Sequence, residues 1–203
     1  MSNQRPPFWR RLFRQKSAAI GASIVLFFML TGVFAPLIAT YDPRQADISS
    51  RLQGYSVNHF FGTDKVGRDV FSRIVYGSRI SIKVGLIAMT FSLSLGMLFG
   101  TIAGYYGGRL ENVIMRLMDM MLALPSILLA MVIVTILGQS LTNAIIAVSI
   151  VYIPQYARIL RGSVLDVREQ DYVMATKAIG ASDFWILKRS ILPNCLAPLI
   201  VQA

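Results

Sequence analysis

The chain has 203 residues, of which 55% are hydrophobic and 15% are charged, and its formal net charge at pH 7 is +10. Soluble domains carry about 25% charged residues, so this composition is typical of a membrane protein and argues against a soluble domain. The basic residues lie in the gaps between apolar runs, and no groove-reading motif accompanies them, which excludes nucleic acid as the expected partner.

The first apolar run covers residues 17–41 and contains no charged residue. About 20 residues are enough for a helix to cross the hydrocarbon core, so we expect the first transmembrane helix here, after a basic N-terminal segment over 1–16. The basic start resembles that of a signal peptide. The apolar run is longer than the roughly 7–15 residues of a signal peptide, and no small-residue cleavage site is evident before Pro36, which favours a retained anchor.

A polar connector over residues 42–80 separates the first two apolar runs. Turn signals at Gly62 and Gly67 precede an amphipathic stretch, in which the residues of one side are apolar: Val70, Phe71, Ile74 and Val75. This pattern predicts an amphipathic helix that lies on the membrane surface. The periodicity alone favours the alternative, a surface-lying connector with no specific partner.

The second uncharged run, residues 84–108, predicts the second transmembrane helix. Small residues recur at every fourth position along it: Ser92, Gly96, Gly100, Gly104 and Gly108. A spacing of four places them on one helical face, where the missing side chains allow another helix to approach closely. We therefore predict a tight helix-packing seam, against the alternative that these glycines are unrelated.

The third uncharged run covers residues 120–157. A single helix of this length would be about 57 Å long, nearly twice the hydrocarbon thickness of about 30 Å, so the run must hold two spans. The turn signal at 138–143 divides them. Pro125 and Pro154 are expected to kink the third and the fourth helix.

Polar residues at these spans suggest two kinds of contact. Arg116 and Asp119 lie three residues apart at the start of the third span, where we expect them to pair. Tyr152, Gln155 and Tyr156 are candidates for lining a transport pathway, because polar side chains in a span face protein or a cavity. Simple hydrogen bonding between helices is an equal alternative for these three.

The distribution of basic residues predicts the orientation of the chain. One side would hold the N-terminus, residues 109–116 and the region after the fourth span, with 13 basic residues against 7 on the other side. The positive-inside rule then places the N-terminus and the segment 171–193 in the cytoplasm.

The segment 171–193 is predicted to form two short helices divided by a glycine. Asp171 is expected to cap the first helix, over 172–179, and Gly180 to end it in the left-handed conformation. Ser182 or Asp183 can cap the second helix, whose expected common face is Phe184, Leu187, Lys188 and Ile191. Two capped helices with a small, flat first face favour docking of another protein, against an ordinary amphipathic loop.

The end of this segment predicts the start of a further span. Lys188 and Arg189 are expected in the last turn of the second helix, where positive charge suits the helix dipole, and Pro193 would mark the start of the fifth span. The residues after Arg189 reach only about 21 Å as a helix. We therefore expect the chain to end inside its fifth span, either as a truncated reading frame or as part of a longer protein.

The sequence offers no set of residues suited to catalysis. His59 and Cys195 are each the single residue of their type, which excludes an intrachain disulfide and a metal site built from Cys or His. The phosphate-binding motif G-x-x-x-x-G-K-[ST] is absent from the sequence, so we do not expect this chain to hydrolyse ATP. The expectation is a protein that is not an enzyme and carries no catalytic residue, metal or cofactor.

Residues 174–193 resemble the cytoplasmic signature of the permease subunits of binding-protein-dependent ABC importers. That signature is Glu-Ala-Ala, three residues, Gly, nine residues and Ile-x-Leu-Pro. Four residues occupy matching positions: Ala175, Gly180, Leu192 and Pro193. Three depart from it, since Met174 replaces Glu, Thr176 replaces the second Ala and Ser190 replaces Ile.

A second resemblance is narrower and extends the first to nearly the whole chain. Residues 61–85, with GTD, GRDVFSR and YGSRIS, resemble the "C" permease subunits of the dipeptide, oligopeptide and nickel branch. This implies an all-α polytopic membrane protein with a type I ABC importer transmembrane domain. Of the six spans of that plan, about four and a half would be present. The partial permease domain would cover 81–203, with a coupling region over 165–193.

The resemblance also implies partners and a function. The coupling region would sit in a cleft of an ATP-hydrolysing subunit, with contacts from Met174, Ala175, Gly180, Ala181 and Asp183. The implied partners are a second homologous permease subunit, two cytoplasmic ABC ATPase subunits, an extracytoplasmic solute-binding protein and the lipid of a bacterial inner membrane. The implied function is ATP-driven import of di- or oligopeptides. The alternatives are a nickel or other solute permease, an inactive truncated permease and, disfavoured by spans without charges, a secondary transporter.

Overall fold

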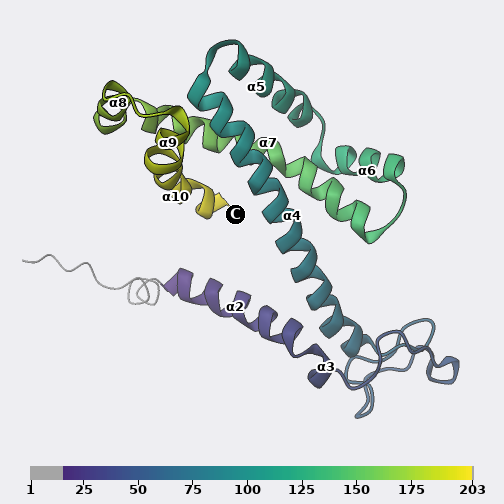
Figure 1. Cartoon of the computed structure of the whole chain (residues 1–203). Coiled ribbons are helices and arrows are strands. Elements are labelled where there is room, and N and C mark those ends of the chain that lie inside the picture. The colour runs from purple at the N-terminus through teal and green to yellow at the C-terminus, as the bar shows by residue number, and fades with distance from the viewer. Residues whose placement is uncertain (1–15, 203) are drawn as a thin grey trace, which may run out of the picture. The chain divides into compact units, whose positions relative to one another are not determined.

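The structure, a computed structural model, describes residues 16–202 and consists mainly of α-helices (Figure 1). Within that range the one β-type pairing is an antiparallel bridge between Thr63 and Asp69. Among these residues, three helices are long and apolar enough to cross a membrane, and a bent pair of helices gives a fourth span if the pair counts as one. The predicted all-α polytopic fold is confirmed, whereas the predicted basic segment 1–16 lies, except for Lys16, outside the described residues.

The chain divides into two compact units, residues 1–84 and 85–203. The first unit contains α2 (Lys16–Val33), which starts the predicted first span, and α3 (Ala35–Ile38). Most residues of α2 are exposed, and its central residues 24–30 are all both exposed and apolar, as lipid contact requires. Gly32, by contrast, is buried, and a methyl group added there would lie 2.9 Å from Ile82 Cδ1.

The long helix α4 (Val70–Tyr106) has 37 residues and contains both the predicted surface helix and the predicted second span. The prediction of a separate surface-lying helix is therefore wrong. One helix runs through both parts because no proline or capping sequence interrupts the stretch between them. The helix begins after Asp69, whose carboxylate accepts a hydrogen bond of 2.8 Å from the backbone N–H of Ser72.

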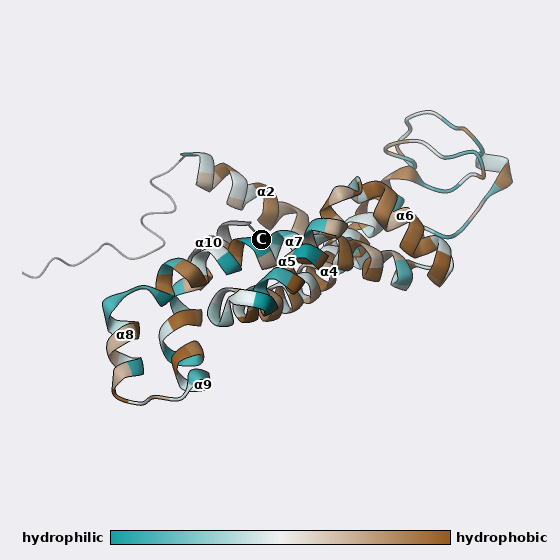
Figure 2. Cartoon of the chain, turned by 90° about the horizontal axis from the view of Figure 1, so that it is seen from above, coloured by the Kyte–Doolittle hydropathy of each residue, from teal (hydrophilic) through white to brown (hydrophobic). Residues whose placement is uncertain are grey.

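In the second unit, α5 (Gly108–Ala123) and α6 (Ser126–Leu137) are bent by 95° relative to one another. The bend lies at Leu124 and Pro125, which confirms the predicted kink, because proline disfavours a helical conformation of the residue before it. α6 is hydrophobic along its length, as the brown colour in Figure 2 shows.

The predicted turn between the third and fourth spans is confirmed. α7 (Leu141–Arg168) starts after Ser140, whose hydroxyl accepts a hydrogen bond of 3.1 Å from the backbone N–H of Asn143. The Asn143 amide in turn donates 2.7 Å and 2.9 Å hydrogen bonds to the carbonyl oxygens of Leu137 and Gly138. One side chain therefore satisfies carbonyl groups that the end of α6 leaves free.

Two short helices follow α7, namely α8 (Asp171–Ala178) and α9 (Asp183–Ile186). A π-helical turn, η2 (Leu187–Ile191), joins α9 directly to α10 (Leu192–Gln202). The prediction that Lys188 and Arg189 lie in a terminal turn is wrong, because the i→i+5 hydrogen bonds of the π turn continue the helix into α10.

The core of the second unit lies around α7, which contacts α5, α6 and α10. Leu160 and Val164 of α7 are fully buried in one cluster with Ile186, Ile191 and Leu199. The segment that follows α7 is thus anchored to this helix by a continuous apolar contact.

Candidate functional site

The two helices α8 and α9 form the candidate docking element. Gln170, not Asp171, occupies the N-cap position of α8, and it makes no side-chain capping bond there. Asp171 lies in the first turn instead, where its charge favours the positive end of the helix dipole. The structure places Gly180 at φ +82°, directly after Ile179, the C-cap residue of α8, and the hydroxyl of Ser182 accepts a 3.4 Å hydrogen bond from the Trp185 N–H.

The buried face of this element differs from the predicted one. Val173 and Ile186 are the buried residues of α8 and α9, whereas the Phe184 side chain is 74% exposed. The predicted common face of Phe184, Leu187, Lys188 and Ile191 is therefore wrong, since the π turn changes the helical period after Ile186. Lys188 and Phe184 do lie together, with the ammonium 5.9 Å from the ring centroid.

The five residues predicted to contact an ATPase lie on this element. Met174, Ala175, Gly180 and Asp183 are exposed, and Ala181 is half-buried against the apolar core cluster. The exposed residues leave room for a partner without disturbing Val173 and Ile186.

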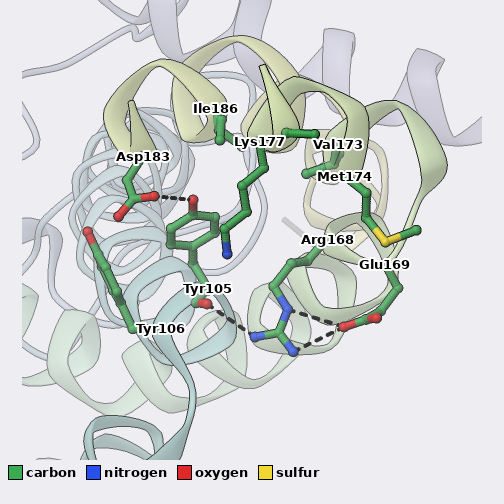
Figure 3. A pocket seen from close by; sticks show the side chains of 10 residues that line it. Tyr105, Tyr106, Arg168, Glu169, Val173, Met174, Lys177, Asp183 and Ile186 are labelled. Atoms are coloured by element: carbon green, nitrogen blue, oxygen red, sulfur yellow. Dashed lines mark hydrogen bonds and ion pairs between the residues drawn. The ribbon is translucent and has the colours of Figure 1, made fainter. Parts of the chain in front are cut away.

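A cavity of about 660 Å³ lies beside the docking element, between α8, α9 and the ends of α4 and α7 (Figure 3). In its wall the Tyr105 hydroxyl donates a 2.6 Å hydrogen bond to Asp183 Oδ1. Arg168 Nη1 donates hydrogen bonds of 3.0 Å and 3.1 Å to the carbonyl oxygens of Gly104 and Tyr105. None of these contacts was predicted from the sequence, because the partners are more than 60 residues apart.

The small residues of α4 face α7. Methyl groups added at Gly96 and Gly100 would overlap atoms of Tyr156 and Ala157, and one at Gly104 would meet Val164 Cβ at 2.8 Å. Ser92 extends the same contact.

The prediction that Gly108 is the fifth residue of the seam is wrong. Gly107 and Gly108 have φ values of +67° and +60°, so they interrupt the helix between α4 and α5. A methyl group added at Gly108 would have no neighbour within 4 Å among the residues that the structure describes. The seam therefore ends at Gly104, because α4 ends at Tyr106 and Gly108 belongs to the next helix.

The three predicted pathway residues line one cavity of about 300 Å³ beside α4 and α7. Tyr152 and Gln155 are exposed and Tyr156 is buried. The wall contributed by α4 includes Ser92 and Met89. The structure thus brings these three side chains together on one side of α7.

Two ion pairs join α5 to α7. Asp119 Oδ1 accepts a 2.7 Å hydrogen bond from Arg158 Nη2, so the predicted pairing of Asp119 with Arg116 is wrong. Glu111 accepts from Arg161 Nε at 2.7 Å and also from its Nη2. The tertiary packing of α5 on α7 brings charges of opposite sign together, and this overrides the local three-residue spacing.

The connector before α4 has its own network of polar contacts. Asp64 Oδ1 accepts backbone hydrogen bonds from Val66 and Arg68, and its Oδ2 accepts from the guanidinium groups of Arg68 and Arg73. Burial opposes the ionised form, but the hydrogen bonds from Arg68 and Val66 prevail and lower the pKa of Asp64 to about 2. The connector is therefore held by a carboxylate that stays ionised.

A second pair lies close to the start of α4. His59 Nδ1 is 3.0 Å from Asp69 Oδ1, and the His59 ring stacks on Tyr41 with centroids 4.9 Å apart. The Asp69 side chain is 1% exposed. Burial opposes its ionised form, but the backbone and hydroxyl hydrogen bonds of Ser72 lower the pKa of Asp69.

Comparisons with known families match both parts of the chain. A family model described as "Binding-protein-dependent transport system inner membrane component" matches residues 96–203. A second model, described as "N-terminal TM domain of oligopeptide transport permease C", matches residues 7–54.

Individual relatives extend the similarity. The chain is 49% identical over 199 residues to the dipeptide transport system permease protein DppC of Alkalihalophilus pseudofirmus, covering 96% of this chain and 66% of that protein. It is 42% identical to DppC of Haemophilus influenzae, with 96% and 68% covered. It is 46% identical to the probable D,D-dipeptide transport system permease protein DdpC of Escherichia coli, with 90% and 61% covered. The chain thus spans about two thirds of the length of these relatives.

Proposed function

The chain belongs to the family of binding-protein-dependent transport system inner membrane components, in the C-type branch of dipeptide and oligopeptide permeases. On that premise we propose that it is the membrane-spanning subunit of an ATP-driven peptide importer. Proteins of this family are membrane transport subunits and not catalytic ones. The proposed location is a bacterial inner membrane, with the N-terminus and the coupling region (165–193) in the cytoplasm. The excess of basic residues on that side supports this orientation.

One observation carries the proposal beyond family membership, namely the way in which α8 and α9 are anchored. Val173 and Ile186 hold the element to the core, while Met174, Ala175 and Gly180 remain exposed. An element that is fixed on one side and accessible on the other can receive force from a partner. We assign this partner to the ATP-hydrolysing subunits, because the resemblance gives the coupling region that role.

The proposed cycle starts with the transfer of a peptide from an extracytoplasmic solute-binding protein to a pore between this subunit and a second, homologous permease. ATP binding in two cytoplasmic subunits then moves the coupling region. The helix that runs from α9 through η2 to α10 carries this movement into the membrane, because Ile191 and Leu199 pack in the same cluster as Leu160 of α7.

Peptides are the proposed substrate class. The relatives named above and a di/tripeptide transport system permease of Pseudomonas aeruginosa, 42% identical, are named for peptides. Tyr152, Gln155 and Tyr156 supply hydroxyl and amide groups at one cavity, and we propose that they contact the peptide during passage.

Purification of the complete transporter and its reconstitution into proteoliposomes test this function. With the solute-binding protein and a labelled dipeptide outside, we expect the ATPase subunits to co-purify and uptake to require ATP in the compartment of the ATPases. Ala175→Trp should prevent ATPase association, because a large side chain at this exposed position obstructs docking, whereas Ala175→Ser should retain it. Dipeptide uptake without ATP and without bound ATPase would instead identify a secondary transporter.

A further inference from the structure

The hydrogen bond between Tyr105 and Asp183 joins the last turn of α4 to the first residue of α9 (Figure 3). Its length of 2.6 Å is typical of a hydroxyl that donates to an ionised carboxylate, which is among the stronger types of hydrogen bond in proteins. The Tyr105 ring packs against the apolar core cluster of the second unit. The ring is therefore fixed by packing, while its hydroxyl fixes the position of α9.

Arg168 makes a second connection at the same turn. It is the last residue of α7, and its Nη1 donates to the carbonyl oxygens of Gly104 and Tyr105. Carbonyl groups in the last turn of a helix lack partners within the helix, so a side chain from outside satisfies them here. Arg168 also donates to Glu169 Oε1 through Nε and Nη2, which fixes the guanidinium plane.

The two connections border the same cavity as Met174, and Asp183 is itself an exposed residue of the docking element. Met174, Ala175 and Gly180 stay accessible while Asp183 and Arg168 hold the end of α4. The same helix α4 carries Gly100 and Gly104, which pack closely against α7. Asp183 of α9 thus contacts α4 directly through one hydrogen bond, and Arg168, three residues before α8 begins, joins the end of α7 to the same turn.

We propose that Tyr105 and Arg168 are positioning residues that transmit movement of the coupling region to α4. This inference rests on the proposed function and deepens it, because it names the residues that link the ATPase-facing element to a membrane helix. Tyr105 is the more informative of the two for a test. Replacement by Phe removes the donor to Asp183 and keeps the ring that packs in the core.

The test uses the complete transporter in proteoliposomes, with labelled dialanine as the transported probe and ATP hydrolysis measured in the same samples. We expect Tyr105→Phe to lower the dipeptide transported per ATP hydrolysed by about fivefold or more, the lower end of typical coupling between sites. Asp183→Ala should have the same effect, and the double variant should lose no more than either single variant. Asp183→Asn should keep most of the coupling, because its amide oxygen still accepts the hydrogen bond.

Tyr106→Phe is the matched control. Tyr106 is the adjacent residue of α4 and is 55% exposed, and its hydroxyl has no hydrogen-bond partner among residues 16–202. A purely structural role of Tyr105 would lower the amount of assembled transporter, and would leave the dipeptide transported per ATP unchanged.

A second measurement does not depend on the transported probe. Hydrogen–deuterium exchange of the last turn of α4 should change on ATP binding in the wild-type transporter and in Tyr106→Phe, but not in Tyr105→Phe. An unchanged response and unchanged coupling in Tyr105→Phe would overturn the inference while leaving the proposed function intact. A wild-type protein without associated ATPase would overturn both, and ATP-dependent exchange without dialanine uptake would refute only the substrate class.

Discussion

The Ser92 hydroxyl of α4 lies 2.9 Å from the carbonyl oxygen of Ser149 in α7 and 2.5 Å from that of Ala88 in its own helix, so the two carbonyl groups share its single proton. Ser92 and Ser149 are both buried, so the bond between them fixes the register of two helices at one end of the seam that Gly96, Gly100 and Gly104 continue. A serine can serve here because small residues on both sides let the backbones approach within reach of a short side chain.

The seam predicts a strong effect of one added methyl group. In Gly100→Ala the new Cβ would lie 2.5 Å from the Ala157 oxygen and 2.9 Å from Leu160 Cβ, so α4 and α7 must move apart. We expect this change to destabilise the purified subunit by about 1–3 kcal/mol, measured as a lower thermal unfolding midpoint in detergent. Gly162→Ala is the control, since a methyl group there has no neighbour within 4 Å. Equal midpoints for the two variants would refute the close packing.

The conformation of Gly180 predicts a ranking of its replacements. At φ +82° an L-residue costs about 1–2 kcal/mol, and a β-branched residue costs most. The added Cβ would have no neighbour within 4 Å, so the effect comes from the backbone and not from a clash. We expect Gly180→Val to reduce ATPase co-purification and peptide uptake strongly, and Gly180→Asn to reduce them little. Similar activity of Gly180→Val and the wild type would mean that the turn can change without loss.

The two ion pairs between α5 and α7 should differ in their contribution to stability. The Glu111 side chain is 18% exposed and accepts two hydrogen bonds from Arg161, whereas the Asp119 side chain is 60% exposed. Exposed pairs contribute about 0–1 kcal/mol, and hydrogen bonds to better shielded charges contribute about 1.5–3 kcal/mol. Thermal unfolding should therefore show a larger loss in Glu111→Gln than in Asp119→Asn. A larger loss in Asp119→Asn would contradict this ranking.

The low pKa of Asp64 predicts how the connector responds to acid. Its pKa of about 2 lies below the value of about 3.9 for an unfolded chain, so its stabilising effect is complete above the unfolded value and disappears as the pH falls through about 2. Pepsin should cut the connector of Asp64→Asn faster than that of the wild type at pH about 4.5, and the difference should vanish toward pH about 2. Equal cleavage at the higher pH would show that the contacts of Asp64 do not hold the connector.

The membrane helices were predictable because long uncharged runs have few alternatives in a bilayer. The run 120–157 is too long for one span, and the caps around Ser140 mark the turn that divides it. The identity of the Asp119 partner was not predictable. Arg158 is 39 residues away in the sequence, and only the packing of α5 on α7 brings the two together.

The candidate site was predictable to a similar degree. Gly180 and Ser182 were identified from local capping preferences, which act over a few residues. The link from Tyr105 to Asp183 depends on the folded positions of two helices 78 residues apart, and no local pattern signals it. The buried face of α9 was missed because the helical period of 3.6 residues does not hold across the π turn.

That π turn acts as a one-residue insertion that the helix has absorbed. Ile186 and Ile191 are both fully buried although they lie five positions apart, and Cys195 and Leu199 follow at the ordinary spacing of four. Deleting a single exposed residue such as Lys188 would restore an uninterrupted α-helical period, with the same apolar side chains still inside. The π turn thus keeps the buried sides of α9 and α10 aligned along one continuous helix, while it adds one residue to the exposed side next to the docking element.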